Sequence, residues 1–329
     1  MERVKWTVVT LAMFLIVCVG VPSSWGWKLE KPLIACQATK TGSIWDKDLR
    51  KFAKLIEERT DGAVKIKVFP GKQLGGAKDL LEGIKIGTVD LTLTVTTYMS
   101  IFEPAYKVVD FHFIFRDRDH AWKCLDGNLG RELNKLIGKR GFKVLGYGES
   151  GWRDMHNNRG PIYTPSDLKG VKIRVRPAPI NVEMFKALGA SPTPMPWVEV
   201  YTSMQQGIID AFDCAIWGLW ELKLYEIVKY SSFTHHQYAP TALVISNKKF
   251  DSFPRKIKKI FLDTAKEVNA AQRETVVKND KKYQEQCEGK GMKFNKVSDK
   301  EPFYTAVKPV ITKYAKEYQN LVDIIEKTK

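Results

Sequence analysis

Two short segments of the chain, roughly a hundred residues apart, have nearly the same sequence. Residues Val64–Pro70 read VKIKVFP and residues Val171–Pro177 read VKIRVRP. In each, apolar and basic residues alternate with a period of two before a proline, which is typical of a strand that ends there. A helical stretch follows in both cases, and then a glycine turn, Gly87–Asp90 in one half and Gly207–Asp210 in the other. Each turn indicates the end of a helix and the start of another strand.

The order strand, helix, strand therefore occurs twice. Repeated units of this kind predict parallel sheets in two similar α/β domains. Without the N-terminal segment described below, the chain has about 300 residues, which is long enough for two hydrophobic cores. No low-complexity linker separates the halves, so the domains must be joined by strands or by a shared helix.

Other elements follow from their periodicity. Strands are expected at Val108–Phe115 and Phe142–Tyr147, and helices at Asp119–Ile137 and, rich in aromatic residues, at Ile216–Tyr230. Proline favours the first turn of a helix, and Pro254 predicts the start of a long helix that extends toward residue 287.

The N-terminus has the features of a secretory signal. Basic Arg3 and Lys5 precede an apolar run, Val8–Val21, and small residues at Ser24 and Gly26 mark a cleavage site before residue 27. A retained membrane anchor is the alternative, but the run is shorter than the ~20 apolar residues that a span needs. We therefore expect residues 1–26 to be a cleaved signal peptide, and the protein to be periplasmic without stable membrane insertion.

The net charge is +16, from 53 basic and 37 acidic residues. Such a charge suits nucleic acid, an anionic surface or a small anion. A nucleic-acid interface would gather basic residues with aromatic ones, whereas here they are spread along predicted helices. We expect a lysine-rich surface and no nucleic-acid partner, with attraction of an anionic ligand as a second effect.

A G-x-G-x-x-G pattern occurs at Gly146–Gly151, directly after a predicted strand. A dinucleotide site needs a helix that begins at the third glycine. The next residues instead read as more strand and then a turn at Asn157–Gly160. The pattern therefore does not indicate a nucleotide, and no cofactor is expected.

Motifs for other chemistry are missing from the sequence. The five histidines have no metal-ligand spacing, and neither a phosphate-binding loop nor a catalytic triad can be assigned. After removal of the signal, four cysteines remain (Cys36, Cys124, Cys214 and Cys287), as disulfides or as free thiols. Two α/β domains without a catalytic set or metal site suggest a protein that closes on a ligand by hinge motion.

Residues Leu168–Ile216 resemble the signature of the substrate-binding proteins of tripartite ATP-independent periplasmic (TRAP) transporters. The matching segments include Leu168–Gly170, Lys172–Val175, Gly189–Met195 and Glu199–Tyr201, and the similarity extends over nearly all of the chain after the signal.

The resemblance implies an α/β fold of the two-lobed type II periplasmic binding protein kind. Two sheets flanked by helices would enclose a ligand cleft, and a long helix would brace both lobes. On this basis we expect residues 27–150 and 240–279 to form lobe I, and residues 151–239 and 280–329 to form lobe II.

The family binds organic carboxylates and delivers them to membrane subunits that are driven by an ion gradient. The resemblance thus implies two partners, an organic-acid anion and TRAP membrane subunits, and no enzymatic activity. Two alternatives remain. One is a secreted α/β enzyme that uses Cys214 with a histidine, and the other is a ligand-sensing subunit of a receptor.

The resemblance also assigns the ligand arginine to Arg174, in the K-I-R-V strand. A guanidinium holds a carboxylate through two parallel hydrogen bonds, which lysine cannot reproduce. Arg153 corresponds to a second pocket arginine of many members. Arg176 would point to the same face as Arg174 but follows the matched segment, and Arg159 suits a structural role.

The chain departs from the family pattern at several positions. Asp213–Ala215 stands where many members have Glu-Asn-Pro, so Cys214 replaces an amide that contacts the ligand. Val95 replaces a pocket carboxylate of some members. We expect Thr96 beside it, and Asp213 and Cys214 in the second half, to contact the ligand. Aromatic walls are expected from Tyr98, Trp152 and Trp217, with Trp45, Trp197, Trp220 and Phe212 as further candidates. These features favour a monocarboxylate with an apolar or aromatic remainder over a sugar acid.

Overall fold

The computed structural model describes residues 27–69 and 71–329. The predicted signal peptide, residues 1–26, lies outside the described residues. The strands are β1 (Leu33–Cys36), β2 (Ile66–Phe69), β3 (Leu91–Val95), β4 (Phe142–Asn157), β5 (Lys172–Val175), β6 (Ser191–Pro194), β7 (Ala211–Cys214), β8 (Tyr230–Ser246) and β9 (Lys293–Lys296).

These strands form a sheet of order β2-β1-β3-β8-β4-β7-β5-β6, with β9 beside β8. Strands β1–β3, the first half, pair in parallel, and so do strands β5–β7, the second half. In each half, the strand that comes first in the sequence (β1 or β5) lies between the other two. The second strand (β2 or β6) forms the outer edge of the sheet, and the third (β3 or β7) lies next to the central pair of β4 and β8. The predicted duplication of an α/β unit is confirmed.

The seven-residue repeat nevertheless falls on strands that are not equivalent in space. The first copy contains β2, an edge strand, whereas the second contains β5, which lies between β7 and β6. The alternating pattern indicates a strand but not its place in the sheet: β2 has no fully buried residue, whereas three of the four residues of β5 are buried.

Strands β4 and β8 are long, 16 and 17 residues, and pair antiparallel along most of their length. One end of β8 pairs with β3 of the first half, and the far end of β4 pairs with β7 of the second half. The two expected sheets are therefore continuous through this pair.

The helices are α1 (Ile44–Arg59), α2 (Ala77–Ile86), α3 (Arg118–Asp126), α4 (Asn128–Gly138), α5 (Pro179–Ala187), α6 (Val200–Gln205), α7 (Ile216–Glu221), α8 (Asn247–Asp251), α9 (Arg255–Glu288), α10 (Glu301–Ala315) and α11 (Gln319–Lys327). Short 3-10 turns include η1 (Thr96–Ile101), η2 (Pro104–Asp110), η4 (Trp197–Glu199) and η5 (Leu224–Glu226). Within the described residues, no helix is long and apolar enough to cross a membrane.

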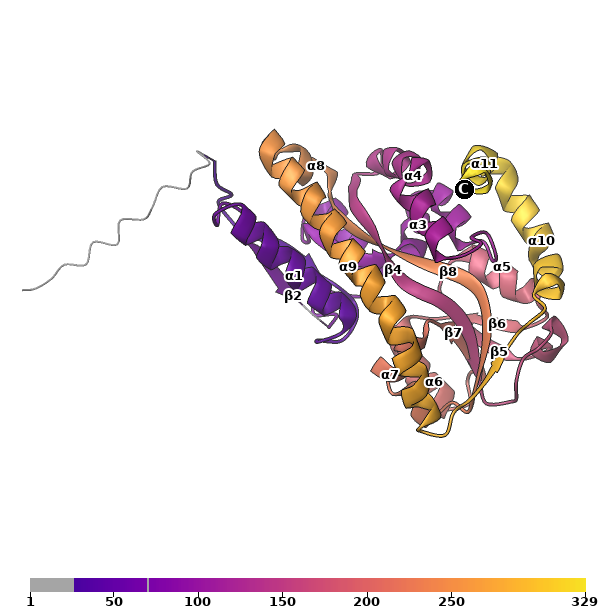
Figure 1. The fold of residues 1–329 in the computed structure, drawn as a ribbon. Coiled ribbons are helices and arrows are strands. Elements are labelled where there is room, and N and C mark those ends of the chain that lie inside the picture. Colours follow the sequence, from indigo (N-terminus) through magenta and orange to yellow (C-terminus); the bar gives the residue numbers. More distant parts are fainter. Residues whose placement is uncertain (1–26, 70) are drawn as a thin grey trace, which may run out of the picture.

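Helix α9, 34 residues long, confirms the predicted bracing helix. It lies across β4 and β8, and it contacts α1 of the first half and α7 of the second (Figure 1). Its buried residues recur every three or four positions, as an amphipathic helix requires. Phe261, for example, packs edge-on against Phe52 of α1, with ring centroids 5.7 Å apart.

The glycines of the G-x-G-x-x-G pattern lie where α9 crosses β4. A Cβ at Gly148 would lie 2.7 Å from Thr241 Oγ1 and 2.8 Å from Gln272 Oε1. Gln272 holds the backbone of Glu149 at this point, accepting its N–H at 2.8 Å and donating to its carbonyl. The register of β4 against β8 shifts between Glu149 and Gly151, and Gly151 has a φ of +115°. The pattern therefore serves helix–strand packing and a bulge, and β4 continues where a nucleotide site would need a helix.

Three predicted elements were wrong in extent or type. The helix expected at Ile216–Tyr230 ends at Glu221, because Lys223 adopts a left-handed conformation and η5 follows. Residues 108–115 form part of η2 and a loop rather than a strand. The helix expected at 119–137 is two helices, separated at Gly127.

Replacing Gly148 with alanine should destabilise the fold by about 1–3 kcal/mol, because the new methyl group overpacks the α9–β4 contact. Urea denaturation followed by circular dichroism measures this. Gly138→Ala is the matched control, since nothing lies within 4 Å of a Cβ at this helical position; there alanine should be neutral or stabilising by up to about 1 kcal/mol. Equal stability of Gly148→Ala and the wild type would contradict the close packing.

Candidate functional site

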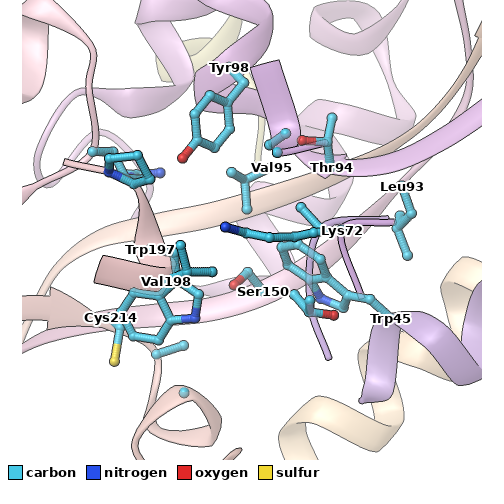
Figure 2. A pocket seen from close by; sticks show the side chains of 18 of the residues that line it. Trp45, Lys72, Leu93, Thr94, Val95, Tyr98, Ser150, Trp197, Val198 and Cys214 are labelled. Carbon is cyan, nitrogen blue, oxygen red and sulfur yellow. The ribbon is translucent and has the colours of Figure 1, made fainter. Parts of the chain in front are cut away.

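A central cavity, partly open to solvent, lies between the two halves of the sheet. Its walls come from the loops after β1 and β2, from β3 and η1, from β4 and β5, and from η4 and α7 (Figure 2). The lining residues are Ala38, Thr39, Trp45, Lys72, Gly76, Ala77, Leu93, Thr94, Val95, Tyr98, Ser150, Arg153, Arg174, Arg176, Pro196, Trp197, Val198, Cys214, Ala215, Trp217 and Gly218.

Arg174, on β5, is a buried charge in the wall of the cavity. Its residue is 1% exposed, and its Nε donates to the Met195 carbonyl at 2.9 Å. The guanidinium lies over the Trp197 ring, 5.5 Å from the centroid. Burial lowers the pKa of Arg174, and within residues 27–69 and 71–329 no carboxylate forms an ion pair with it. A buried cation without a counter-ion is costly, so this position favours an anionic ligand.

Arg153, on β4, is paired from within the protein. Its Nε donates to Asp213 Oδ2 at 2.5 Å, and its terminal nitrogen donates to the Asp213 carbonyl. Burial would raise the pKa of Asp213, but Arg153 and then His236 outweigh it and hold that pKa well below its ordinary value. The pair fixes the direction of Arg153 while the residue still lines the cavity.

Arg176, two residues after Arg174 on the same face, also lines the cavity. It donates to Thr97 and Gln237 and lies 3.7 Å from Asp110. Burial lowers the pKa of Arg176 to about 10 and raises that of Asp110, because an ion pair of this length offsets only part of the desolvation. Three buried arginines therefore stand against two buried aspartates, which leaves one positive charge for a ligand.

Tryptophans from both halves close the cavity. The rings of Trp45 on α1 and Trp217 on α7 lie 5.5 Å apart between centroids, and Trp217 Nε1 donates to the Ser150 carbonyl at 2.5 Å. Trp45 Nε1 has no hydrogen-bond partner among the described residues. The two halves thus touch through aromatic rings beside the ligand space.

Hydroxyl groups supply the neutral polar part of the cavity. Figure 2 shows the Tyr98 hydroxyl directed toward the interior, with Thr94 and Ser150 also on the wall. Within the described chain the Thr94 hydroxyl has no hydrogen-bond partner. Cys214 lies on the same wall, and burial raises the pKa of its thiol. All four described cysteines are free and buried.

The structure brings five of the eight predicted site residues to the cavity: Arg153, Arg174, Cys214, Trp217 and Tyr98. The other three lie elsewhere. Asp213 is buried behind Arg153, and the Thr96 hydroxyl donates to the Pro240 carbonyl at 3.3 Å. Trp152 lines a separate hollow beside α9, where its ring packs on His235, because alternate residues of β4 face opposite sides of the sheet.

Sequence reasoning missed other lining residues, notably Lys72, Thr94 and Ser150. Thr94 lies on β3, a strand whose residues are all buried, and Lys72 lies in the turn between β2 and α2. Neither position has a local signal that distinguishes a cavity from ordinary surface or core.

Comparison with known families decides what kind of protein carries this cavity. The model of bacterial extracellular solute-binding protein family 7 matches residues 35–317. The chain belongs to this family. Its members are the solute-binding proteins of TRAP transporters, so the predicted resemblance is confirmed.

Several proteins of known ligand are similar to this solute-binding protein. The 2,3-diketo-L-gulonate-binding periplasmic protein of Escherichia coli is 40% identical over 233 residues, 71% of each chain. A TRAP periplasmic solute-binding protein from Bordetella, with density interpreted as pantoate, is 34% identical with a TM-score of 0.86, covering 91% of this chain and 100% of that one. One from Polaromonas, bound to D-erythronate, is 31% identical with a TM-score of 0.87, covering 91% and 99%.

The solute-binding protein shares the partners of its family, a small organic-acid anion and the TRAP membrane subunits that receive it. The family is periplasmic and consists of solute receptors. The predicted α/β fold is likewise confirmed by these solved structures.

Replacing Asp213 with asparagine should destabilise the protein by about 3 kcal/mol, because Arg153 loses its buried counter-charge. The folded pKa of Asp213 is depressed relative to about 3.9 in an unfolded chain, so its contribution is complete above that pH and is lost as the pH falls below it. The loss of stability on acidification below about pH 4 should therefore be smaller in Asp213→Asn.

Urea denaturation at several pH values measures both effects. Asp210→Asn is the control, because Asp210 pairs with Arg159, whose side chain is 52% exposed, and should cost at most about 1 kcal/mol. A cost for Asp213→Asn as small as that of the control would rule out a strong buried pair.

Proposed function

We propose that this protein captures a hydroxylated organic acid in the central cavity and delivers it to TRAP membrane subunits. The observation that carries the proposal is Arg174, a buried guanidinium on the cavity wall without a carboxylate partner among the described residues. The ligand carboxylate would bind Arg174 through parallel hydrogen bonds, with Arg153 beside it. Binding would then complete the charge balance of the buried cluster.

We infer that the remainder of the ligand is polar, in place of the apolar or aromatic group that the sequence suggested. The named ligands of the similar proteins are diketogulonate, pantoate and D-erythronate, all of them keto or hydroxy acids. The hydroxyls of Thr94, Tyr98 and Ser150 and the Trp45 Nε1 support a ligand with oxygen substituents. The expectation from sequence treated the tryptophans and Tyr98 as aromatic walls, whereas Trp45 and Tyr98 also bring an indole N–H and a hydroxyl to the cavity.

We further propose that binding, without catalysis, is the function. The rival enzyme needed a reactive Cys214, but burial raises the pKa of this thiol, which disfavours the nucleophilic thiolate. Export through residues 1–26 and action in the periplasm belong to the same proposal.

The proposed lobes, residues 27–150 with 240–279 and residues 151–239 with 280–329, would close on the ligand by hinge motion. The support is that β4 changes its surroundings close to this point: as far as Gly148 it pairs with the part of β8 that also pairs with β3, and from Asp154 onward it pairs with β7. Helix α9 continues through the proposed lobe boundary at residues 279 and 280, and it would brace both lobes.

Replacing Arg174 with lysine should weaken acid binding by about a hundredfold or more, since a bidentate contact is lost from a buried site. Isothermal titration calorimetry with D-erythronate, D-glucuronate and pantoate measures the affinity, and circular dichroism checks the fold. Arg159→Lys is the control, because Arg159 lies outside the cavity lining and binds Asp210 at the surface. Unchanged affinity in Arg174→Lys would remove this residue from the site.

A further inference from the structure

Lys72 also lines the cavity, but it takes no part in the ion pairs between the arginines and the aspartates. It lies in the turn between β2 and α2, and Figure 2 shows its side chain extending across the cavity with the ammonium group near the middle. In the part of the chain that the structure describes, no carboxylate pairs with it, and its ammonium group donates no hydrogen bond. The side chain is half-buried.

The backbone holds Lys72 in an unfavourable conformation. Its φ is +65°, in the left-handed region that non-glycine residues seldom adopt. The turn is fastened on both sides: Gly71 N donates to the Thr39 carbonyl at 3.0 Å, and Gly75 N donates to the Lys72 carbonyl at 2.9 Å. Such strain persists where the surroundings impose it, and it is concentrated at ligand-binding positions.

Lys72 and Arg174 approach the ligand from opposite parts of the molecule. The turn that carries Lys72 follows β2, at one edge of the sheet, whereas Arg174 lies on β5, near the other edge. A solute that contacts both side chains would therefore link the two halves.

The charges of the cavity wall point to the chemistry of that solute. Lys72, Arg153, Arg174 and Arg176 line the cavity, and none of the lining residues is acidic. Asp213 and Asp110, behind the wall, pair with Arg153 and Arg176. Arg174 and Lys72 remain, so two positive charges face the ligand. Such a field favours a dianion over a monoanion of the same shape.

We propose that Lys72 is a second anchor and that the cavity prefers a hydroxylated dicarboxylate over the monocarboxylate with the same carbon skeleton. One carboxylate binds Arg174 and the other, at the remote end, binds Lys72. This inference rests on the proposed function and adds to it the residue that selects the second charge.

Calorimetry with two matched pairs of acids tests the inference: D-glucarate against D-gluconate, and D-galactarate against D-galactonate. In at least one pair the dicarboxylate should bind the wild type about tenfold more tightly, which corresponds to about 1.4 kcal/mol. Lys72→Met should bring that ratio close to one, because it should weaken binding of the dicarboxylate much more than binding of the monoacid. Lys78→Met, an equal loss of charge at an exposed lysine that pairs with Glu82, should retain the wild-type ratio.

The outcomes separate this inference from the proposed function. Tighter binding of the monoacids, or binding of D-glucuronate and D-erythronate without either dicarboxylate, overturns the second anchor and leaves the role of Arg174 intact. A ratio that survives Lys72→Met also overturns it. Failure of the wild type to bind any of these acids contradicts the proposed function itself. Circular dichroism of both methionine variants confirms that they are folded.

Discussion

The antiparallel pairing of β4 and β8 is the constraint on which both the fold and the cavity depend. These strands run through both halves of the sheet, so the parallel units on either side are joined by continuous hydrogen bonding. Helix α9 crosses the pair, and the small glycines of β4 permit its close approach. The same strand then presents Arg153 to the cavity and Trp152 to the opposite side. A single stretch thus connects helix packing, the passage between halves and the ligand wall.

The second governing feature is the excess of positive charge at the cavity. Asp213 and Asp110 stabilise and orient two of the three buried arginines, whereas Arg174 has no carboxylate partner among the described residues. A site arranged in this way is less stable when empty than one with a full set of counter-ions. Its advantage is that the field is already directed at the solute before binding, so little reorganisation is needed.

Strong local patterns predicted most elements, and the exceptions have physical causes. The long helix after Pro254 and the glycine turns were visible because periodicity and end signals agree. The aromatic run after Ile216 resembled one helix because its spacing suits burial, but tertiary packing ended it at Glu221. The apolar run at 108–115 resembled a strand, yet its residues are buried among packed turns. Burial alone does not specify secondary structure.

By itself, the sequence determined the duplicated α/β units, the bracing helix, the family, and Arg174 and Arg153 as candidates for the ligand site. These depend on local periodicity or on a contiguous motif, which a linear chain displays directly. Only the tertiary structure decided that Asp213 is committed to Arg153, that Trp152 faces away, and that Lys72 reaches the cavity from the far edge of the sheet. In each case side chains that are more than fifty residues apart in the sequence lie close together in the structure. Strand order and register determine which of them meet.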